Sequence, residues 1–294
     1  MKFAENCPDL ARSPLPLQQT DLFLQASSGR RISVIDGGTP VAQAVCVARW
    51  GMRLCSRGPV WLTDCDQIAA LRSLRRAGVS LINGEIGDAG ALRAAGFRPL
   101  LSGATMAELD LAEWREGIDS KWRARLRQSL DLTRHFTLRA APFDPLKDRW
   151  LLRASARLAQ ERRFAAYPER FTGRLAANPG AARIWSLHNN RTPIAGIMVL
   201  HHGHSATYHL AWSGPEGRRC HAHRRLLALA ADWLAARGVK RLDLGTIDTD
   251  NAPGLARFKL TMGARAVPLA GTWGAFPVWP RSRRAARDRI DPDG

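Results

Sequence analysis

Acidic residues that follow one predicted strand are the first place in the sequence where chemistry is expected. Asp243, Asp248 and Asp250 gather at the C-terminal end of a predicted strand over residues 241–245. In α/β sheets this end of a strand presents side chains to ligands. A carboxylate placed there is suited to accept a proton from an amine. Asp243 and Asp248 are therefore candidate catalytic residues, although each is also typical of a loop carboxylate or a helix cap.

A rare lysine follows these carboxylates. The chain has five lysines against 39 arginines, and Lys259 lies on a predicted short helix that runs into a glycine. A cation there is suited to hold a phosphate or to stabilise the oxyanion formed when an amine attacks a carbonyl carbon. Its neighbour Phe258 is expected in the core or in a pocket wall. Tyr208, one of two tyrosines, lies in the middle of a predicted strand, where a packing role and a pocket role are equally compatible with the sequence.

Arginines form two further candidate binding groups. Arg218 and Arg219 lie in a loop before a predicted helix, and helix N-termini bind phosphates through backbone N–H groups. That loop lacks the two closely spaced glycines of a CoA pyrophosphate loop. Arg57, Lys121 and Arg123 belong to the densest positive charge in the middle of the chain. They suit a phosphorylated acceptor or an RNA backbone, and equally a solvated helix face.

The composition is typical of a globular, reduced protein but leaves the charge open to two interpretations. The net charge of +18 favours an anionic partner, whereas a chain rich in arginine and alanine and poor in lysine also arises from biased codon usage. The five cysteines show no paired spacing, which is typical of a reducing compartment. No apolar signal segment and no membrane-length apolar stretch is found, so we expect a cytoplasmic protein without a membrane span.

Histidines provide the remaining pattern that suggests a site. His201, His202, His204 and His209 lie close together in the sequence, but no cysteine or carboxylate completes a metal-ligand spacing. The glycine motifs of nucleotide-binding folds and the nucleophile motif of hydrolases are also missing from the sequence. We therefore expect no metal and no bound cofactor. The oligomeric state is not fixed by the sequence.

An internal repeat organises the elements that must position these residues. Residues 32–42 and 184–195 each predict two strands joined by a tight turn, and further strands follow in both halves. A helix, near residues 67–76 in the first half and 221–237 in the second, then precedes Gly-Val and another strand. A short helix ending at a glycine closes each half. The recurring order predicts two domains of one topology.

Between the two halves the sequence predicts two helices, over residues 121–132 and about 145–161. The first is capped by Asp119 or Ser120. Its buried face is expected to carry residues spaced four apart, namely Trp122, Leu126 and Leu130.

We expect an α/β (α+β) fold with a mixed sheet and flanking helices in each domain. The expected divisions are a first domain at residues 1–115, a helical connector packed with the second domain at 116–162, a second domain at 163–278, and a basic, disordered tail at 279–294.

This twice-used order of three strands, helix, strand, helix and strand resembles the tandem GNAT-like domains of Fem-type transferases. The matching motifs are Arg57–Gly58–Pro59–Val60–Trp61, Leu109–Asp110–Leu111 followed by Lys121–Trp122–Arg123, Ala206–Thr207–Tyr208–His209, Leu242–Asp243–Leu244–Gly245, and Phe258–Lys259 with Gly263. The resemblance covers roughly residues 17–273.

The resemblance implies an enzyme that transfers an acyl or aminoacyl group to the primary amine of a small or peptide-like acceptor. With the residue types above, it assigns Lys259, Asp243 and Asp248 to catalysis, Arg218, Arg219, Phe258 and Tyr208 to the donor, and Arg57, Trp61, Lys121 and Arg123 to the acceptor.

The donor is left between aminoacyl-tRNA and acyl-CoA. The missing CoA glycines and the positive charge favour tRNA, whereas the sequence lacks the heptads of the long coiled-coil arm found in peptidoglycan-bridge ligases, which favours CoA. A GNAT-like pair that binds RNA or another ligand without turnover is the alternative outside the enzymes.

Overall fold

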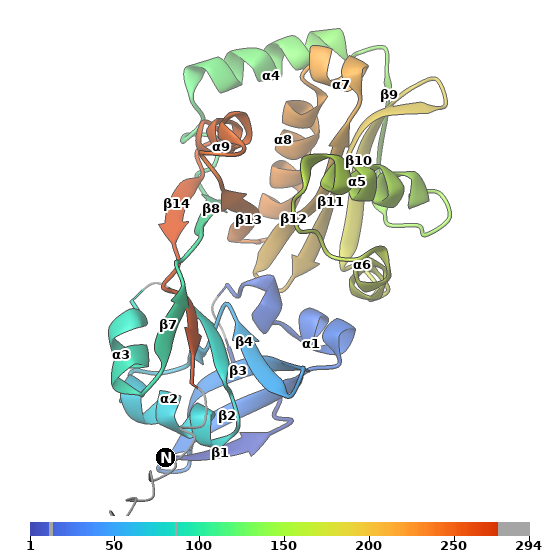
Figure 1. Cartoon of the computed structure of the whole chain (residues 1–294). Helices are drawn as coiled ribbons and strands as arrows, with labels where there is room; N and C mark the ends of the chain where they lie inside the picture. Colours follow the sequence, from blue (N-terminus) through green and yellow to red (C-terminus); the bar gives the residue numbers. More distant parts are fainter. Residues whose placement is uncertain (12–13, 86, 276–294) are drawn as a thin grey trace, which may run out of the picture.

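The computed structural model describes residues 1–11, 14–85 and 87–275, which form two lobes with one β-sheet each (Figure 1). The first sheet contains, in spatial order, β1 (Lys2–Glu5), β2 (Arg30–Asp36), β3 (Thr39–Arg49), β4 (Met52–Ser56), β6 (Leu81–Gly84), β15 (Gly271–Gly274) and β7 (Arg98–Leu101), with β5 (Val60–Trp61) paired to β3. The helices of this lobe are η1 (Leu17–Gln19, a 3-10 turn), α1 (Asp21–Ser27), α2 (Gln67–Arg76) and α3 (Ala89–Ala94).

The second sheet contains, in spatial order, β14 (Arg265–Pro268), β8 (Thr105–Asp110), β13 (Arg241–Ile247), β12 (Ser205–Ser213), β11 (Thr192–His202), β10 (Ala182–Asn189) and β9 (Thr137–Pro142). Its helices are α4 (Ser120–Leu132), α5 (Arg149–Arg162), α6 (Glu169–Ala176), α7 (Pro215–Arg219), α8 (Ala222–Ala235) and α9 (Pro253–Leu260). In Figure 1, α4 crosses the top of this lobe and α5 and α6 lie on the opposite side from α9.

The two lobes repeat one topology, which confirms the predicted α/β fold with tandem domains. The hairpins β2–β3 and β10–β11 both turn through two residues, and Gly37, Gly38 and Asn190 have φ values of 54°, 89° and 52°. Glycine and asparagine tolerate this left-handed region, and such turns match the twist of the strands. Each lobe then places one parallel pair in its sheet, β4 with β6 and β12 with β13.

The first predicted helix between the halves is present as α4, but one of its predicted core residues is exposed. The Asp119 carboxylate accepts hydrogen bonds from the N–H groups of Lys121 and Trp122, which confirms the cap. Trp122 is buried, whereas Leu130 is 46% exposed and Ser129 is buried in its place. At 100° per residue, Leu130, eight positions after Trp122, lies about 80° away from it around the helix axis. Ser129, seven positions after Trp122, lies on almost the same side of the helix as Trp122.

The second predicted helix begins later than expected. α5 begins at Arg149 because the Asp144 carboxylate accepts hydrogen bonds from the N–H groups of Leu146 and Lys147 and holds this segment in a turn. The predicted basic tail lies outside the described residues.

The lobes exchange strands, so the sheets do not divide at a single point of the sequence. β8, from the expected first domain, pairs with β13 and β14, and β15, from the expected second domain, lies between β6 and β7. The two crossing segments touch at Gly103 and Gly271. A Cβ added to Gly103 would lie 1.8 Å from the Leu269 oxygen, and one on Gly271, whose φ is +96°, 2.5 Å from the Leu101 oxygen. The crossing therefore requires glycine at both positions.

An apolar core joins the lobes beside this crossing. Leu17, Phe23 and Val45 of the first lobe are buried in one cluster with Leu151 and Met198 of the second. Burial of such side chains contributes roughly 1.5–3 kcal/mol each. The faces that meet between the lobes are therefore held in a defined arrangement, which a shared site requires.

The exchanged strand gives a test of the fold. Trp273 of β15 is 4% exposed in the core of the first lobe, so Trp273→Ala should lower the free energy of unfolding by roughly 3–5 kcal/mol. Trp50→Ala is the matched control, because Trp50 is 79% exposed and its replacement should cost less than about 1 kcal/mol. Urea denaturation measures both, and equal effects would contradict the exchange.

Candidate active site

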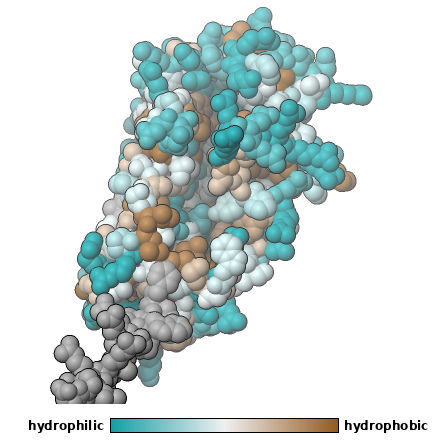
Figure 2. Space-filling model, in the orientation of Figure 1, coloured by the Kyte–Doolittle hydropathy of each residue, from teal (hydrophilic) through white to brown (hydrophobic). Residues whose placement is uncertain are grey.

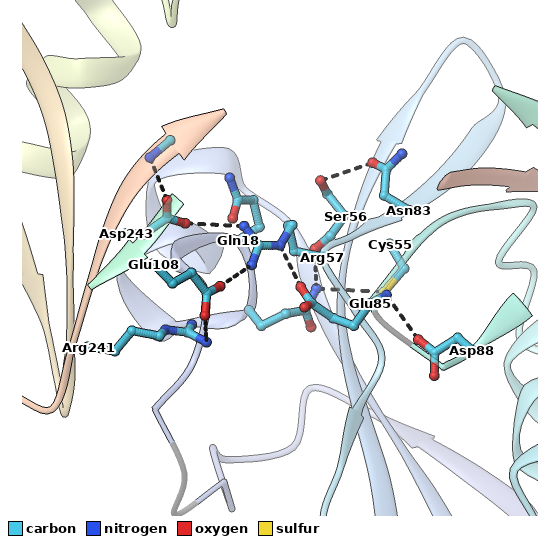
Figure 3. Close-up of polar contacts among 12 residues, drawn as sticks. Gln18, Cys55, Ser56, Arg57, Asn83, Glu85, Asp88, Glu108, Arg241 and Asp243 are labelled. Atoms are coloured by element: carbon cyan, nitrogen blue, oxygen red, sulfur yellow. Dashed lines mark hydrogen bonds and ion pairs between the residues drawn. The ribbon is translucent and has the colours of Figure 1, made fainter. Parts of the chain in front are cut away.

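Arg57 connects the two lobes through its side-chain contacts (Figure 3). It follows β4 of the first lobe, and its guanidinium donates hydrogen bonds to Asp243 on β13 and to Glu108 on β8, both at 3.1 Å. A third bond goes to Glu85, which follows β6. Arg241 lies 3.6 Å from the other oxygen of Glu108. A single arginine thus holds carboxylates from both sheets.

This cluster is almost closed to solvent. Arg57 is 5% exposed, Asp243 6% and Glu108 7%. Burial alone lowers the pKa of Arg57, but the hydrogen bond to Glu85 and the nearby carboxylates outweigh it and raise the pKa, so the guanidinium stays charged. Buried charges of this kind are costly unless each is paired, and here the pairing spans the lobes.

Lys259 lies on α9, above the same end of β13. Its ammonium donates to the Thr246 carbonyl at 2.7 Å, and the residue is 5% exposed. Burial lowers the pKa of Lys259 to about 8, although the Asp243 charge opposes this effect. The second oxygen of Asp243 accepts a hydrogen bond from Gly245 N–H at 2.7 Å. The sequence-predicted pair Asp243 and Lys259 therefore meets at one place, together with Arg57.

The second sheet splits next to these residues. β12 and β13 pair in parallel only between Ser205–Thr207 and Arg241–Asp243. Beyond Asp243, β13 follows β8 through a shift in register, while β12 continues with half-buried residues as far as Ser213. Figure 2 shows the surface receding here, between α9 and α5. Facing backbone groups of a splayed pair lack a ladder partner and are available to a ligand.

Positive charge surrounds the N-terminal end of α8, where the splayed strand β12 leads. The Arg224 guanidinium lies 5.3 Å from the centre of the Phe258 ring, which packs against Trp122 of α4. Burial lowers the pKa of Arg224 and of His221, and the charge of Arg125 on α4 lowers both further. In the described part of the chain, neither Arg125 nor Arg224 forms an ion pair. Like charges held together without a carboxylate favour an anionic ligand.

The segment that contains this splayed pair and α8 matches a known protein family. Residues 118–260 match the model of the acetyltransferase (GNAT) domain. Over these residues the chain is similar to a GNAT domain. The segment contains α4, the splay, α8 and Lys259, so the candidate residues of the second lobe lie in the matched region. Among curated protein sequences, none matches the chain.

Solved structures extend the likeness to both lobes. The crystal structure of FemX has 14% identity and a TM-score of 0.68, over 88% of this chain and 91% of that chain. The C-terminal domain of a putative lysylphosphatidylglycerol synthetase from Agrobacterium fabrum has 12% identity and a TM-score of 0.59, over 89% of each chain. A tandem GNAT protein from the clavulanic acid biosynthesis pathway has 13% identity and a TM-score of 0.52, over 84% and 82%. The resemblance to Fem-type tandem GNAT proteins is thus confirmed in the fold.

Other candidate residues of the GNAT domain are engaged in local structure. Asp248 accepts hydrogen bonds from the N–H groups of Asn251 and Asp250 and from the Asn251 side chain, which lower the pKa of its carboxyl. These bonds tie the Asp248 carboxylate to its own turn, next to Asp250 and Asn251. Tyr208 packs against the core of this lobe, and burial raises the pKa of its phenol. Arg218 donates to the Ser213 carbonyl at 2.6 Å, while Arg219 is exposed.

The four predicted acceptor residues do not come together. Arg57 lies between the lobes, whereas the Trp61 indole donates to Asp88 within the first lobe. Lys121 and Arg123 are exposed on α4 at the far end of the second lobe (Figure 1), because the buried side of that helix packs on α8. Of this group, Arg57 alone touches the candidate active site.

Sequence reasoning missed several residues that surround Arg57. Glu85 and Glu108 are its ligands, and the Tyr167 hydroxyl accepts a hydrogen bond from Gln18. Burial raises the pKa of Tyr167, and the charge of Asp243 raises it further. The hydrogen bond from Gln18 and the charge of Arg57 lower this pKa, but the net shift is upward. Glu108 lies between the apolar residues Ala107 and Leu109 of β8, and a carboxylate at that place in the pattern is the signal that was available.

The histidines have separate surroundings. His202 Nε2 lies 2.9 Å from the Thr207 hydroxyl, and burial lowers its pKa to about 3. His209 stacks on Tyr167, and burial lowers its pKa to about 4. In residues 1–11, 14–85 and 87–275, no three His, Cys, Asp or Glu side chains gather in a way that would hold a metal ion. Among the same residues, no helix has the length and apolar character needed to cross a membrane.

Arg57 provides the first test of the site. Arg57→Met should lower the free energy of unfolding by roughly 3–5 kcal/mol, because Glu108 and Asp243 would remain buried without their cation. Adding Glu108→Gln and Asp243→Asn should recover most of this loss. In the control Arg157→Met, an exposed pair with Glu161 is broken and the cost should stay below about 1 kcal/mol. Urea denaturation measures all three; no recovery in the triple variant would contradict the charge argument.

The pKa of Lys259 gives a second test. Its folded value of about 8 lies below the usual 10.5, so between these pH values the unfolded chain holds a proton that the folded protein has lost. Stability should therefore rise with pH in this window. Lys259→Met removes this contribution, so the stability of wild type relative to this variant should increase from pH 8 to pH 10. Urea midpoints measured at several pH values report the difference; a flat or falling difference would show that Lys259 is not desolvated.

Proposed function

We propose that the protein transfers an aminoacyl or acyl group to a primary amine, with aminoacyl-tRNA as the favoured donor. The GNAT match and the tandem fold support a transferase of this broad class. The observation that carries the proposal is the meeting of Lys259, Asp243 and Arg57 where β12 and β13 separate.

In the proposed reaction, the acceptor nitrogen attacks the carbonyl carbon of the donor ester. A C–N bond forms, and the C–O bond to the ribose oxygen breaks. Asp243 accepts the proton that the attacking neutral amine loses and passes it to the ribose oxygen, which leaves as a hydroxyl. The Lys259 ammonium donates a hydrogen bond to the oxyanion of the tetrahedral intermediate, a contribution typically worth a factor of 10²–10³ in rate.

Arg57 is a positioning residue in this scheme. It binds one oxygen of Asp243 while Gly245 N–H binds the other, so the carboxylate is fixed between β13 and the first lobe. The pKa of Lys259, near 8, leaves most of its amine protonated at neutral pH, as the proposed role requires. Asp248 is less suited to the proposed role by its position, because its carboxylate is bonded within its own turn to Asp250 and Asn251 and not to Arg57.

The preference for tRNA rests on the cations near α8. Arg125 and Arg224 lie close enough for the charge of Arg125 to lower the pKa of Arg224, no carboxylate among the described residues pairs with either, and Arg224 covers the Phe258 ring. Guanidinium groups bind phosphate oxygens in two-pronged geometry, and an arginine-lined surface suits an RNA backbone. The loop that precedes α8 lacks the paired glycines of a CoA site. Acyl-CoA is the alternative donor, supported by the GNAT domain model itself.

Charged total tRNA and acetyl-CoA, each offered at 50 mM and 200 mM salt with an added amine, test the donor. We expect tRNA binding that weakens steeply with salt, and transfer of the amino acid to the amine. If acetyl-CoA binds saturably at both salt concentrations and its acetyl group is transferred to the amine, the donor is acyl-CoA and the preference for tRNA is wrong.

Lys259→Ala separates the enzyme from a binding module in the same assay. Transfer should fall by about 10²–10³ with tRNA binding retained, whereas Lys147→Ala, on an exposed lysine, should change neither. Binding of tRNA without transfer to any amine tested would contradict the enzymatic proposal and leave a non-catalytic RNA-binding module.

A further inference from the structure

A second cleft opens between the lobes, beside the Arg57 cluster. It has a volume of about 630 Å3 and lies between the β3–β4 hairpin and α1 of the first lobe and α6 of the second. Ser56, next to Arg57 in the chain, lines it, and so does Tyr167. The charges of Asp243 and Arg57 act on the Tyr167 hydroxyl. The cleft therefore ends close to the candidate active site.

Apolar side chains form the walls of this cleft. The apolar lining residues are Phe23, Ala26, Val45, Val47, Leu54 and Phe171. The aromatic rings pack together, with Phe171 5.5 Å from Phe23 and 5.0 Å from Tyr167. Such a wall favours a hydrocarbon portion of a ligand.

The serine hydroxyls of the walls are already occupied. Ser27 donates to the Leu24 carbonyl, and Ser56 donates to the Asn83 side chain. A nucleotide base or a sugar needs free donors and acceptors to be held in one orientation. These walls offer few, so an aliphatic chain fits better than a base.

Cations line the same cleft. Arg49, Arg170 and Arg174 line it, all three are exposed, and none forms an ion pair among the described residues. Trp50, at the tip of the β3–β4 hairpin, is 79% exposed, and the Arg49 guanidinium lies 4.0 Å from its ring centre. An exposed tryptophan beside arginine is typical of surfaces that meet lipid headgroups.

We propose that this cleft binds an amphiphile, with its aliphatic chain against Phe23 and Phe171 and a phosphate or carboxylate held by Arg49, Arg170 and Arg174. Binding of the amphiphile does not depend on the proposed transfer reaction. That the amphiphile is the amine acceptor does rest on the proposed function, because a headgroup amine reaching past Tyr167 would approach Asp243.

Calorimetric titration with dodecyl phosphate below its micelle concentration tests the site. We expect binding of one molecule per chain, at least tenfold tighter than binding of inorganic phosphate or of dodecyl maltoside, since each of these lacks one half of the proposed recognition. Arg170→Ala with Arg174→Ala should weaken binding of dodecyl phosphate by at least tenfold. Arg153→Ala with Arg162→Ala is the matched control, on exposed arginines of α5 outside the cleft, and should leave it unchanged.

Three outcomes would overturn the proposal. Equal weakening by both variant pairs would indicate attraction by net charge alone. Binding of dodecyl maltoside as tight as dodecyl phosphate would remove the role of the arginines. Binding of uridine diphosphate tighter than dodecyl phosphate would make the cleft a nucleotide site.

The acceptor role is tested separately with the 2-aminoethyl ester of dodecyl phosphate. This compound should accept the transferred group, and the Arg170 and Arg174 variant should raise its KM more than it lowers kcat. Transfer to simple amines but not to this bound compound would refute the acceptor role while leaving the transfer reaction intact. Tight binding with no transfer to any amine would refute the proposed function and leave the amphiphile site standing.

Discussion

The structure depends on one desolvated guanidinium. Arg57 is buried between two sheets, and two of its three carboxylate ligands belong to the other lobe. A buried cation without partners would be very costly, so the lobes must meet in the arrangement that brings Glu108 and Asp243 to it. Replacement of such a cluster by apolar side chains is often neutral for stability. We therefore infer that the main effect of Arg57 is to specify how the two lobes are placed relative to each other. Its net contribution to stability is expected to be smaller.

The strand exchange makes this placement possible. β8 comes from the first half of the sequence but lies in the second sheet, where it pairs with β13. It carries Glu108, which accepts a hydrogen bond from Arg57 of the first lobe. β15 returns from the second lobe to the first and buries Trp273 there. Gly103 and Gly271 permit the close passage of both connections. Separation of the lobes would therefore break two sheets as well as the ion cluster.

Local features of the fold were predictable from the sequence, whereas the exchange was not. The Gly37–Gly38 turn, the Asp119 cap and the apolar face of α8 each depend on neighbours within a few residues. The partners of β8 and β15 lie more than one hundred positions away in the sequence, and strands of six and four residues carry no mark of which sheet they join. The prediction that Leu130 is buried was wrong because a strict spacing of four residues drifts around the helix. After two turns such a position no longer lies on the buried face.

The candidate site shows the same division. Asp243 and Lys259 were accessible from residue type and position at a strand end and on a short helix. Their link to Arg57 was not, since 186 positions separate Arg57 from Asp243. Tyr167 gave no signal except its rarity, because it lies in a segment outside regular structure between α5 and α6.

The placement of charge around β13 fits the two substrates of the proposed reaction. On one side, the end of α8 with Arg125 and Arg224 presents cations next to the splay, where the proposed donor enters. On the other side, Tyr167 stacks on His209 of β12 and leads to the apolar cleft. Asp243 lies between these sides, held by Arg57 and balanced by Lys259. In the proposed reaction the unpaired arginines take the donor phosphate on one side of β13 and the cleft beside Tyr167 takes the acceptor on the other, so the charge pair that fixes the lobes also lies where the two substrates would meet.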